Sequence, residues 1–245
     1  MSAFDQPRPA TAWPSWAPTA SFGLLAGMVA GLVLAAACDV LSLVACFRLR
    51  SVIGTDGGFT AASADSFDSA VSLYDAAARY QVIAYLPCAI VFVAWFLHMR
   101  RRTEPLGPDR FRNGPSWAVW AWCIPLANLW MPHRVATDMW TAATPLPRDG
   151  EPYRSRLWPV HLWWTLFLAS GLFNRLAAYK YKHAVTFTEA RSGVTQDIVS
   201  DALHLGAAAA AVYFAYRLTV MQRVKATAGP FGPAPVQPRT AEGTP

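Results

Sequence analysis

The sequence predicts an all-α integral membrane protein with four transmembrane helices, a short proline-broken re-entrant or interfacial segment and an amphipathic surface helix. Three observations support this fold class. Only 15% of the 245 residues are charged and 54% are hydrophobic, whereas a soluble domain carries about 25% charged residues. Four apolar runs are each long enough to cross a bilayer, which takes roughly 20 helical residues. Arginines flank these runs mainly on one side, as the preference for positive charge at the cytoplasmic face requires.

The four predicted spans cover residues 21–47, 80–99, 157–178 and 199–218. As helices they satisfy their own backbone hydrogen bonds, which lipid cannot do for them. Pro87 interrupts the second span and predicts a kink, whereas Pro159 lies in the first turn of the third, where proline is tolerated. A cleaved or lipidated signal peptide ending near Cys38 is the alternative for the first run. Against it, only Arg8 precedes the run, which continues past Cys38 to Phe47.

The predicted membrane domain, residues 21–225, lies between two proline-rich tails. Residues 1–20 contain four prolines and residues 226–245 contain five, and we expect both tails to be disordered. Four spans place the two termini on the same side of the membrane. We expect that side to be the cytoplasm, because it then collects the arginines of the 100–156 region and of the C-terminal tail. Arg48 and Arg50 lie outside in this arrangement and count against it.

Between the second and third spans, residues 117–131 form an apolar segment that is short for a membrane span. Its 15 residues would make a helix of about 22 Å, and Pro125 interrupts it. A fifth crossing would move the later arginines to the wrong side, so we predict a re-entrant or interfacial element. Residues 132–143 follow as an amphipathic helix whose apolar face includes Val135, Met139 and Trp140. We expect this helix to lie in the headgroup plane.

Arginine and tryptophan side chains near these segments are expected to contact lipid and to set the topology. Arginine attracts anionic headgroups on the cytoplasmic side, and tryptophan prefers the membrane interface. The residues assigned to this role are Arg100, Arg101, Arg102, Trp117, Trp130 and Trp140.

The same region carries a recognisable pattern. It consists of Trp95, Arg100-Arg101-Arg102, Leu106-Gly107, Pro115-Ser116-Trp117-Ala118-Val119, Trp122, Pro125, Asn128-Leu129-Trp130, Pro132 and Trp140. With these residues the chain resembles a bacterial membrane protein family catalogued as domain of unknown function 4328, densely over residues 95–140 and loosely over 21–225. Two positions depart from the pattern, since the family has Arg-Asn-Ala in place of Arg102-Thr103-Glu104 and a small residue in place of Trp120. The resemblance implies a multi-pass membrane protein, and it does not indicate any particular activity.

Polar residues inside the spans are the candidate functional residues. In the first span, small residues at positions 23, 27, 31 and 35 share one helix face, which allows close packing, and Asp39 continues it. In the fourth span, Asp197, Asp201 and His204 share one face. The predicted outer-leaflet polar cluster comprises Asp39, Asn174, Arg175, Asp197, Asp201 and His204. In one interpretation, Arg175 pairs with either Asp39 or Asp201, and His204 carries a proton. In the other, the charges only hold the helices in register.

Several functions have no support in the sequence. It contains no glycine-rich phosphate loop, HExxH motif, nucleophile elbow or EF-hand pattern, and its four cysteines form no CxxC pair. We therefore expect no metal, no cofactor and no enzymatic activity. The net charge of +6 does not indicate nucleic acid, because the arginines flank apolar runs.

The leading functional interpretation is a plasma-membrane protein that acts through interaction or membrane organisation. Its expected partners are the bilayer, anionic headgroups on the cytoplasmic side and other membrane proteins. A channel or transporter that uses the outer polar cluster is the first alternative, and a membrane enzyme that uses Asp201 and His204 for acid–base chemistry is the second. A cavity lined by Asp39, Asp201 and His204 would favour either alternative, whereas a sealed bundle would favour the leading interpretation.

Overall fold

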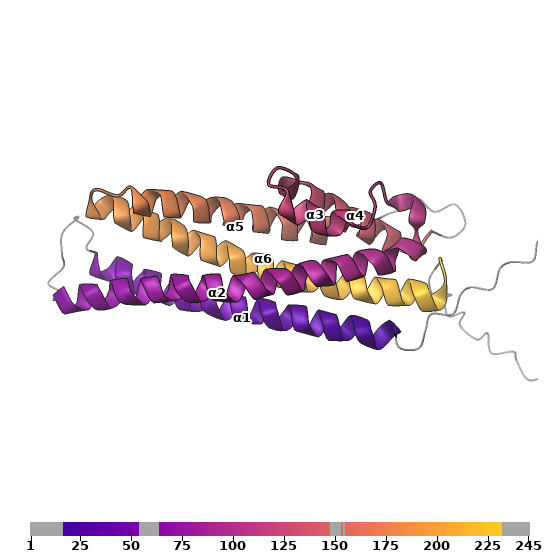
Figure 1. The fold of residues 1–245 in the computed structure, drawn as a ribbon, viewed down its shortest axis with the longest axis horizontal. Coiled ribbons are helices and arrows are strands. Elements are labelled where there is room, and N and C mark those ends of the chain that lie inside the picture. The colour runs from indigo at the N-terminus through magenta and orange to yellow at the C-terminus, as the bar shows by residue number, and fades with distance from the viewer. Residues whose placement is uncertain (1–16, 54–63, 148–152, 154, 232–245) are drawn as a thin grey trace, which may run out of the picture.

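A computed structural model describes residues 17–53, 64–147, 153 and 155–231, and it is built of helices. The α-helices are α1 (Ala17–Val52), α2 (Ala64–Thr103), α3 (Trp117–Cys123), α4 (Met131–Ala143), α5 (Trp158–Lys182) and α6 (Phe187–Ala228). Three 3-10 turns join them, η1 (Glu104–Leu106), η2 (Pro108–Arg110) and η3 (Ala127–Leu129). The four long helices lie along the long axis in Figure 1, and residues 104–143, here named the cap, lie at one end. The predicted all-α class is confirmed.

Three of the helices are long and apolar enough to cross a membrane, over Phe22–Val52, Asp65–Leu106 and Phe187–Thr227. The chain is therefore a multi-pass membrane protein. The fourth predicted span corresponds to α5, whose 25 residues reach about 37 Å but which is not among the three. The helices also extend beyond the predicted spans. With 42 residues, α6 is about 63 Å long, twice the roughly 30 Å of a hydrocarbon core.

The boundaries of the predicted tails shift because the terminal helices are longer than expected. Helix α1 begins at Ala17 and α6 ends at Ala228, so each helix includes a few residues that the sequence assigned to a disordered tail. Residues 1–16 and 232–245, which make up most of both tails, lie outside the described residues. Pro159 lies in the first turn of α5 as predicted, and Pro87 lies inside α2, which remains helical on both sides of it.

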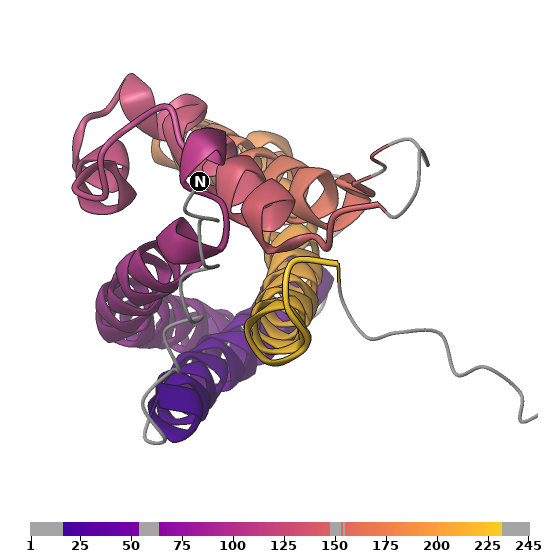
Figure 2. The ribbon, with the colours of Figure 1, turned by 90° about the vertical axis from the view of Figure 1, so that its right-hand side faces the viewer.

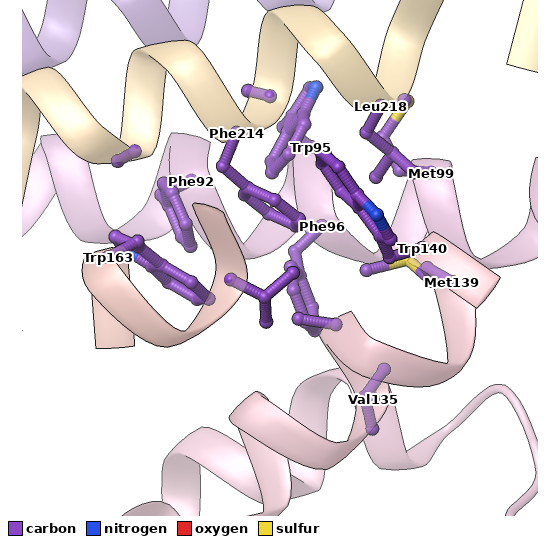
Figure 3. Packing of buried hydrophobic residues seen from close by; sticks show 14 of the residues in the cluster. Phe92, Trp95, Phe96, Met99, Val135, Met139, Trp140, Trp163, Phe214 and Leu218 are labelled. Carbon is purple, nitrogen blue, oxygen red and sulfur yellow. The ribbon is translucent and has the colours of Figure 1, made fainter. Parts of the chain in front are cut away.

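Phe214 of α6 is the centre of an aromatic core that joins four helices (Figure 3). It is fully buried. The ring of Trp163 from α5 stacks on it at 5.1 Å and 2°, and that of Trp140 from α4 stacks at 5.9 Å and 21°. Trp95 from α2 meets it edge-on at 6.1 Å. Aromatic pairs in these geometries stabilise by about 0.5–1.5 kcal/mol each beyond the area they bury.

The packing of α4 corrects the prediction that its apolar face lies in the headgroup plane. Val135, Met139 and Trp140 are buried in the same core as Phe214, and Trp140 is only 4% exposed. The helix is amphipathic, as predicted, but its apolar face covers α2, α5 and α6 rather than lipid. Trp140 is therefore a core residue and not a membrane anchor.

Two buried cations attach the cap to the long helices. The Lys225 ammonium of α6 donates hydrogen bonds to the carbonyl oxygens of Ala142 at 2.8 Å and Thr144 at 3.1 Å, which are carbonyls near the end of α4. Arg100 of α2 is 2% exposed, donates to the carbonyl of Asn113 at 2.9 Å and pairs with Glu104 at 3.2 Å. Such charge-assisted bonds are stronger than neutral ones, so both ends of the cap are held.

A pair of histidines also joins the cap to α5. His133 Nε2 lies 2.9 Å from His161 Nδ1, and the two rings stack at 5.0 Å. Burial lowers the pKa of His133, and the neighbouring His161 lowers it further. A hydrogen bond between two imidazole nitrogens needs one neutral ring to accept it, and the lowered pKa of His133 favours its neutral form.

Residues 117–131 do not form a single helix that could span a bilayer. Helix α3 has seven residues, about 10 Å, and the chain is extended at Ile124 before Pro125. Viewed from the cap end, the cap lies beside the ends of the long helices rather than among them (Figure 2). The side chains of Trp120, Leu126 and Trp130 point outward and are 57%, 70% and 53% exposed.

The α5–α6 hairpin provides a test of the packing. A Cβ on Gly193 would lie 3.0 Å from the backbone nitrogen of Tyr181, which is tighter than most packed Cβ contacts, so the backbone of α5 would have to move. We expect Gly193→Ala to lower the free energy of unfolding by about 1–3 kcal/mol, a usual result of overpacking, measured by reversible unfolding in mixed detergent micelles. Gly171→Ala is the matched control, because nothing lies within 4 Å of its added Cβ. Equal stability of the two variants would contradict this close contact.

Candidate functional site

Five side chains from three helices form a buried polar cluster at a distance from the cap. They are Asp39 of α1, Gln81 and Tyr85 of α2, and Asp201 and His204 of α6. This set is here named the polar cluster. Tyr85 precedes the end of α2 at Thr103 by 18 residues, which is about 27 Å along the helix. The cluster therefore lies far along the bundle from the cap.

Small residues bring α1 close enough to α2 for this contact. A Cβ on Gly31 would lie 3.5 Å from the Cys88 sulfur and 3.6 Å from its Cα, so the two backbones approach closely there. Ala35 follows one turn later and is 1% exposed, and Asp39 comes a further turn on and is fully buried. The prediction that Asp39 points into the bundle is therefore met, since it lies on the face that packs against α2.

Asp39 is the centre of the polar cluster. Its Oδ2 lies 2.7 Å from His204 Nδ1, and its Oδ1 accepts hydrogen bonds from the Tyr85 hydroxyl and from Gln81 Nε2 at 3.1 Å. One proton lies between His204 Nδ1 and Asp39 Oδ2, because a hydrogen bond needs one donor and one acceptor.

Gln81 links the two carboxylates. Its Nε2 donates to Asp39 Oδ1 at 3.1 Å and to Asp201 Oδ1 at 3.0 Å, so each hydrogen of one amide group serves one carboxylate. Asp201 is 5% exposed. Removing two carboxylates from water is costly unless each is paired or hydrogen-bonded, and Gln81 supplies a donor to both. The cluster can thus hold a negative charge and a proton inside the bundle.

The structure separates the predicted site residues into three groups. It brings Asp39, Asp201 and His204 together. Asp197 lies nearer the α5–α6 turn and accepts a hydrogen bond from Tyr74 of α2 instead. Asn174 and Arg175 are exposed on α5.

The proposed pairing of Arg175 with Asp39 or Asp201 is wrong in this structure. Asp39 is fully buried and its carboxyl contacts His204, whereas Arg175 lies on an exposed face of α5. The sequence does not show which way a long side chain points near the end of a span, because it can reach water there as easily as the interior of the bundle. The partners of Asp39 are therefore His204, Tyr85 and Gln81, and not the arginine that the sequence predicted.

Sequence reasoning missed Gln81 and Tyr85. Both lie in the first turns of the second predicted span and are four residues apart, so they share a helix face. That spacing is the signal that could have found them. Neither residue is charged, and a polar uncharged residue near the end of a span is common at the interface.

An apolar cavity of about 230 Å³ lies next to the polar cluster. His204 and Tyr85 line it at one end, but Asp39 and Asp201 are not among the lining residues. The bundle is thus neither sealed nor hollowed around its two carboxylates. The sequence analysis set two alternatives, a cavity lined by Asp39, Asp201 and His204 or a sealed bundle. The structure matches neither, because only His204 of these three residues lines the cavity.

One comparison with known proteins gives a match. A protein-family model described as "Domain of unknown function (DUF4328)" matches residues 59–220, which include α2, the cap, α5 and most of α6. It confirms the resemblance seen in residues 95–140. Four members of the polar cluster lie within the match, and Asp39 lies before it. No curated protein and no solved structure matches the chain.

The bridging role of Gln81 can be tested by a double-mutant cycle. Gln81→Met keeps the shape of the side chain and removes both donors, so we expect a loss of about 2–5 kcal/mol in the free energy of unfolding. Removing one charge with Asp201→Asn should reduce the effect of Gln81→Met, which gives a coupling energy of about 1 kcal/mol or more. Additive effects of the two substitutions, measured by reversible unfolding in micelles, would contradict the bridge.

Proposed function

This chain belongs to the DUF4328 family, and we propose that it is a four-span protein of the bacterial plasma membrane that organises lipid or partner proteins at its cap, without enzymatic activity. The observation that carries the proposal is the outer surface of residues 117–131. Large apolar side chains are exposed there, beside arginines at the same end of the bundle. These are Trp120, Ile124, Leu126, Leu129 and Trp130. An exposed apolar patch of this kind marks a membrane or protein contact.

The proposal takes α5 as the fourth span. Its length of about 37 Å exceeds the roughly 30 Å hydrocarbon core, and it packs along α6. Leu162, Leu172 and Leu176 are 44%, 58% and 42% exposed on its outer face, which suits contact with acyl chains. With α5 across the membrane, the start of α1, the cap and the end of α6 share one side. We propose that this side is the cytoplasm, as the basic residues near the cap favour.

The charge available to lipid is smaller than the sequence indicated. Arg100 is buried, with its guanidinium on the ring of Phe111 at 3.6 Å and on Glu104, so it stabilises the cap and does not face the headgroups. Arg101 and Arg112 are exposed beside it. These two arginines, with Trp130, are the side chains that we propose to contact anionic headgroups.

A transporter remains the second candidate, on one specific observation. His204 belongs to the polar cluster and also lines the cavity, so a proton site and a small-molecule space share a side chain. Such intramembrane ionisable residues commonly mark substrate or proton pathways. The cap is favoured as the primary functional region because its exposed apolar surface needs no further conformational change to reach its partner.

A topology map tests the four-span arrangement directly. Reporters placed after residues 20, 60, 110, 150, 188 and 235 should place 20, 110, 150 and 235 in the cytoplasm and 60 and 188 outside. Opposite locations for 110 and 150 would mean that residues 117–131 cross the membrane. The same location for 150 and 188 would mean that α5 does not cross. Either result would overturn the proposed arrangement.

Lipid selection by the cap can be measured in nanodiscs that contain phosphatidylcholine and phosphatidylglycerol. We expect the double variant Arg101→Gln/Arg112→Gln to retain fewer phosphatidylglycerol molecules in native mass spectra, because each arginine near an anionic surface contributes about 1 kcal/mol. The charge-matched control is Arg48→Gln/Arg175→Gln, which removes two arginines that are also exposed but lie away from the cap. Equal phosphatidylglycerol retention in the two double variants would show that the cap does not select anionic lipid.

A further inference from the structure

The cavity beside the polar cluster is elongated along the helices. It lies between α1, α2, α5 and α6 and measures about 230 Å³. On α2 its lining extends from Tyr85 to Val93, eight residues or about 12 Å along the helix axis. Alanine side chains on α1, α2 and α6 leave this space open between the helices. They are Ala35, Ala89, Ala207, Ala208 and Ala211.

The volume and the length of the cavity both correspond to a single hydrocarbon chain. An engineered apolar cavity of about 150 Å³ binds benzene, which has six carbons, so 230 Å³ has room for about nine carbons (6 × 230/150). Nine carbons in a line are joined by eight bonds of about 1.5 Å each, which span at most about 12 Å. The space therefore has the dimensions of an unbranched chain segment, whereas two fused rings with as many carbons would be shorter and wider.

The lining offers an occupant few hydrogen bonds. The Tyr85 hydroxyl and Nδ1 of His204 lie at one end, and both are already bonded to Asp39. The other lining side chains are aliphatic or aromatic, apart from the thiol of Cys88. An apolar space of this kind excludes water, and an alkyl chain that fills it gains the dispersion contacts that an empty cavity lacks.

The cavity reaches the outer surface of the bundle beside Ala89. Helix α1 packs along α2 and α6, and α5 packs along α6, but α2 does not pack along α5 in the part of the chain that the structure describes. Ala89 lines the cavity and is also exposed on α2. Its neighbours Leu86 and Ile90 are 66% and 63% exposed. The lipid-facing surface of α2 is therefore continuous with the cavity wall.

The depth of this opening indicates which part of a lipid meets it. Ala89 lies at the middle of the predicted span 80–99, and the lining of α2 extends four residues, about 6 Å, to each side of it. The ends of acyl chains meet at the middle of a bilayer, whereas the headgroups begin about 15 Å away. A helix of another protein is about 10 Å wide and does not fit in the cavity. The occupant that the surroundings supply is therefore the end of an acyl chain.

We propose that this cavity binds the terminal segment, about nine carbons long, of one unbranched phospholipid acyl chain, which enters from the bilayer beside Ala89. The bound segment lies parallel to the helices, with Trp122 of the cap at one end of the site and Tyr85 and His204 at the other. The inference goes beyond the proposed role of the cap, because it concerns the space inside the bundle and requires no contact between the outer cap surface and headgroups.

The test photolabels the full chain in nanodiscs of straight-chain phosphatidylcholine. One phosphatidylcholine probe carries a diazirine next to the terminal methyl group of an unbranched chain, and a second probe carries it next to the ester. Tandem mass spectrometry locates the adducts. We expect the terminal probe to label Phe92 and Trp163, which line the cavity and are only 8% and 2% exposed. It should also label Ile90 and Leu172, which are exposed to lipid.

The probe that carries the diazirine next to the ester should label neither cavity residue, because its reactive group stays near the membrane surface. Absence of adducts on both Phe92 and Trp163 with the terminal probe would overturn the proposal. Equal labelling of these two residues by the two probes would also overturn it, since the bound segment would then not be the end of the chain.

Branched lipid provides a test on the unchanged protein. Methyl branches make a chain wider than the cavity, so phosphatidylcholine with phytanoyl chains should not compete for the site, whereas straight-chain phosphatidylcholine does. We therefore expect a small amount of the terminal probe to label the two cavity residues more strongly, relative to the two lipid-exposed residues, when the surrounding lipid is branched. An unchanged ratio would contradict selection of an unbranched chain.

Substitutions locate the chain in the cavity. Ala208→Leu fills the cavity and should remove the adducts on the two cavity residues while it keeps those on the two lipid-exposed residues. Ala209→Leu, at the adjacent exposed position on α6, is the matched control and should keep all the adducts. Persistence of the cavity adducts in Ala208→Leu would show that the chain binds elsewhere. Neither variant changes the arginines of the cap, so failure here is distinct from failure of the proposed lipid selection.

Discussion

The buried carboxyl group of Asp39 is the constraint on which the arrangement of the long helices depends. A carboxylate inside a membrane bundle must find its partners within the protein, and Asp39 finds Tyr85 and Gln81 on α2 and His204 on α6. A slide of either helix by one turn, about 5.4 Å, would break these contacts. The small face of α1 permits the approach, but a face of small residues alone allows neighbouring registers. The polar cluster selects one of them.

The cap adds a second constraint at the other end, and this one is apolar. Trp140 and Trp122 extend from the cap into the bundle, where they meet Phe214 and Phe92. Lys225 holds the end of α4 through its backbone carbonyls. The cap is thus part of the folded core, and its Trp122 lines the cavity between the long helices. Its outer surface, with Trp120 and Trp130 exposed, is left for lipid or a partner.

The sequence was sufficient for features that depend on periodicity and insufficient for those that depend on pairing. Helical spacing of three and four residues predicted that Asp39 faces the bundle and that Asp201 and His204 share a face, and both hold. The same reasoning predicted the apolar face of α4. It could not distinguish lipid from protein as the neighbour of that face, because Trp140 can pack against either. Likewise it could not tell that Arg100 folds back onto Phe111 and Glu104, since a basic residue near a span suits a headgroup equally well.

The polar cluster and the cavity share two side chains, Tyr85 and His204, so a change in one site affects the other. His204 uses Nδ1 to bind Asp39, and its ring also forms part of the cavity wall. A change in the surroundings of that ring reaches Asp39, whose Oδ2 lies 2.7 Å from His204 Nδ1. At its other end the cavity meets Trp122, which belongs to the cap. In the part of the chain that the structure describes, the cavity lining therefore runs from the polar cluster to Trp122 of α3 in the cap.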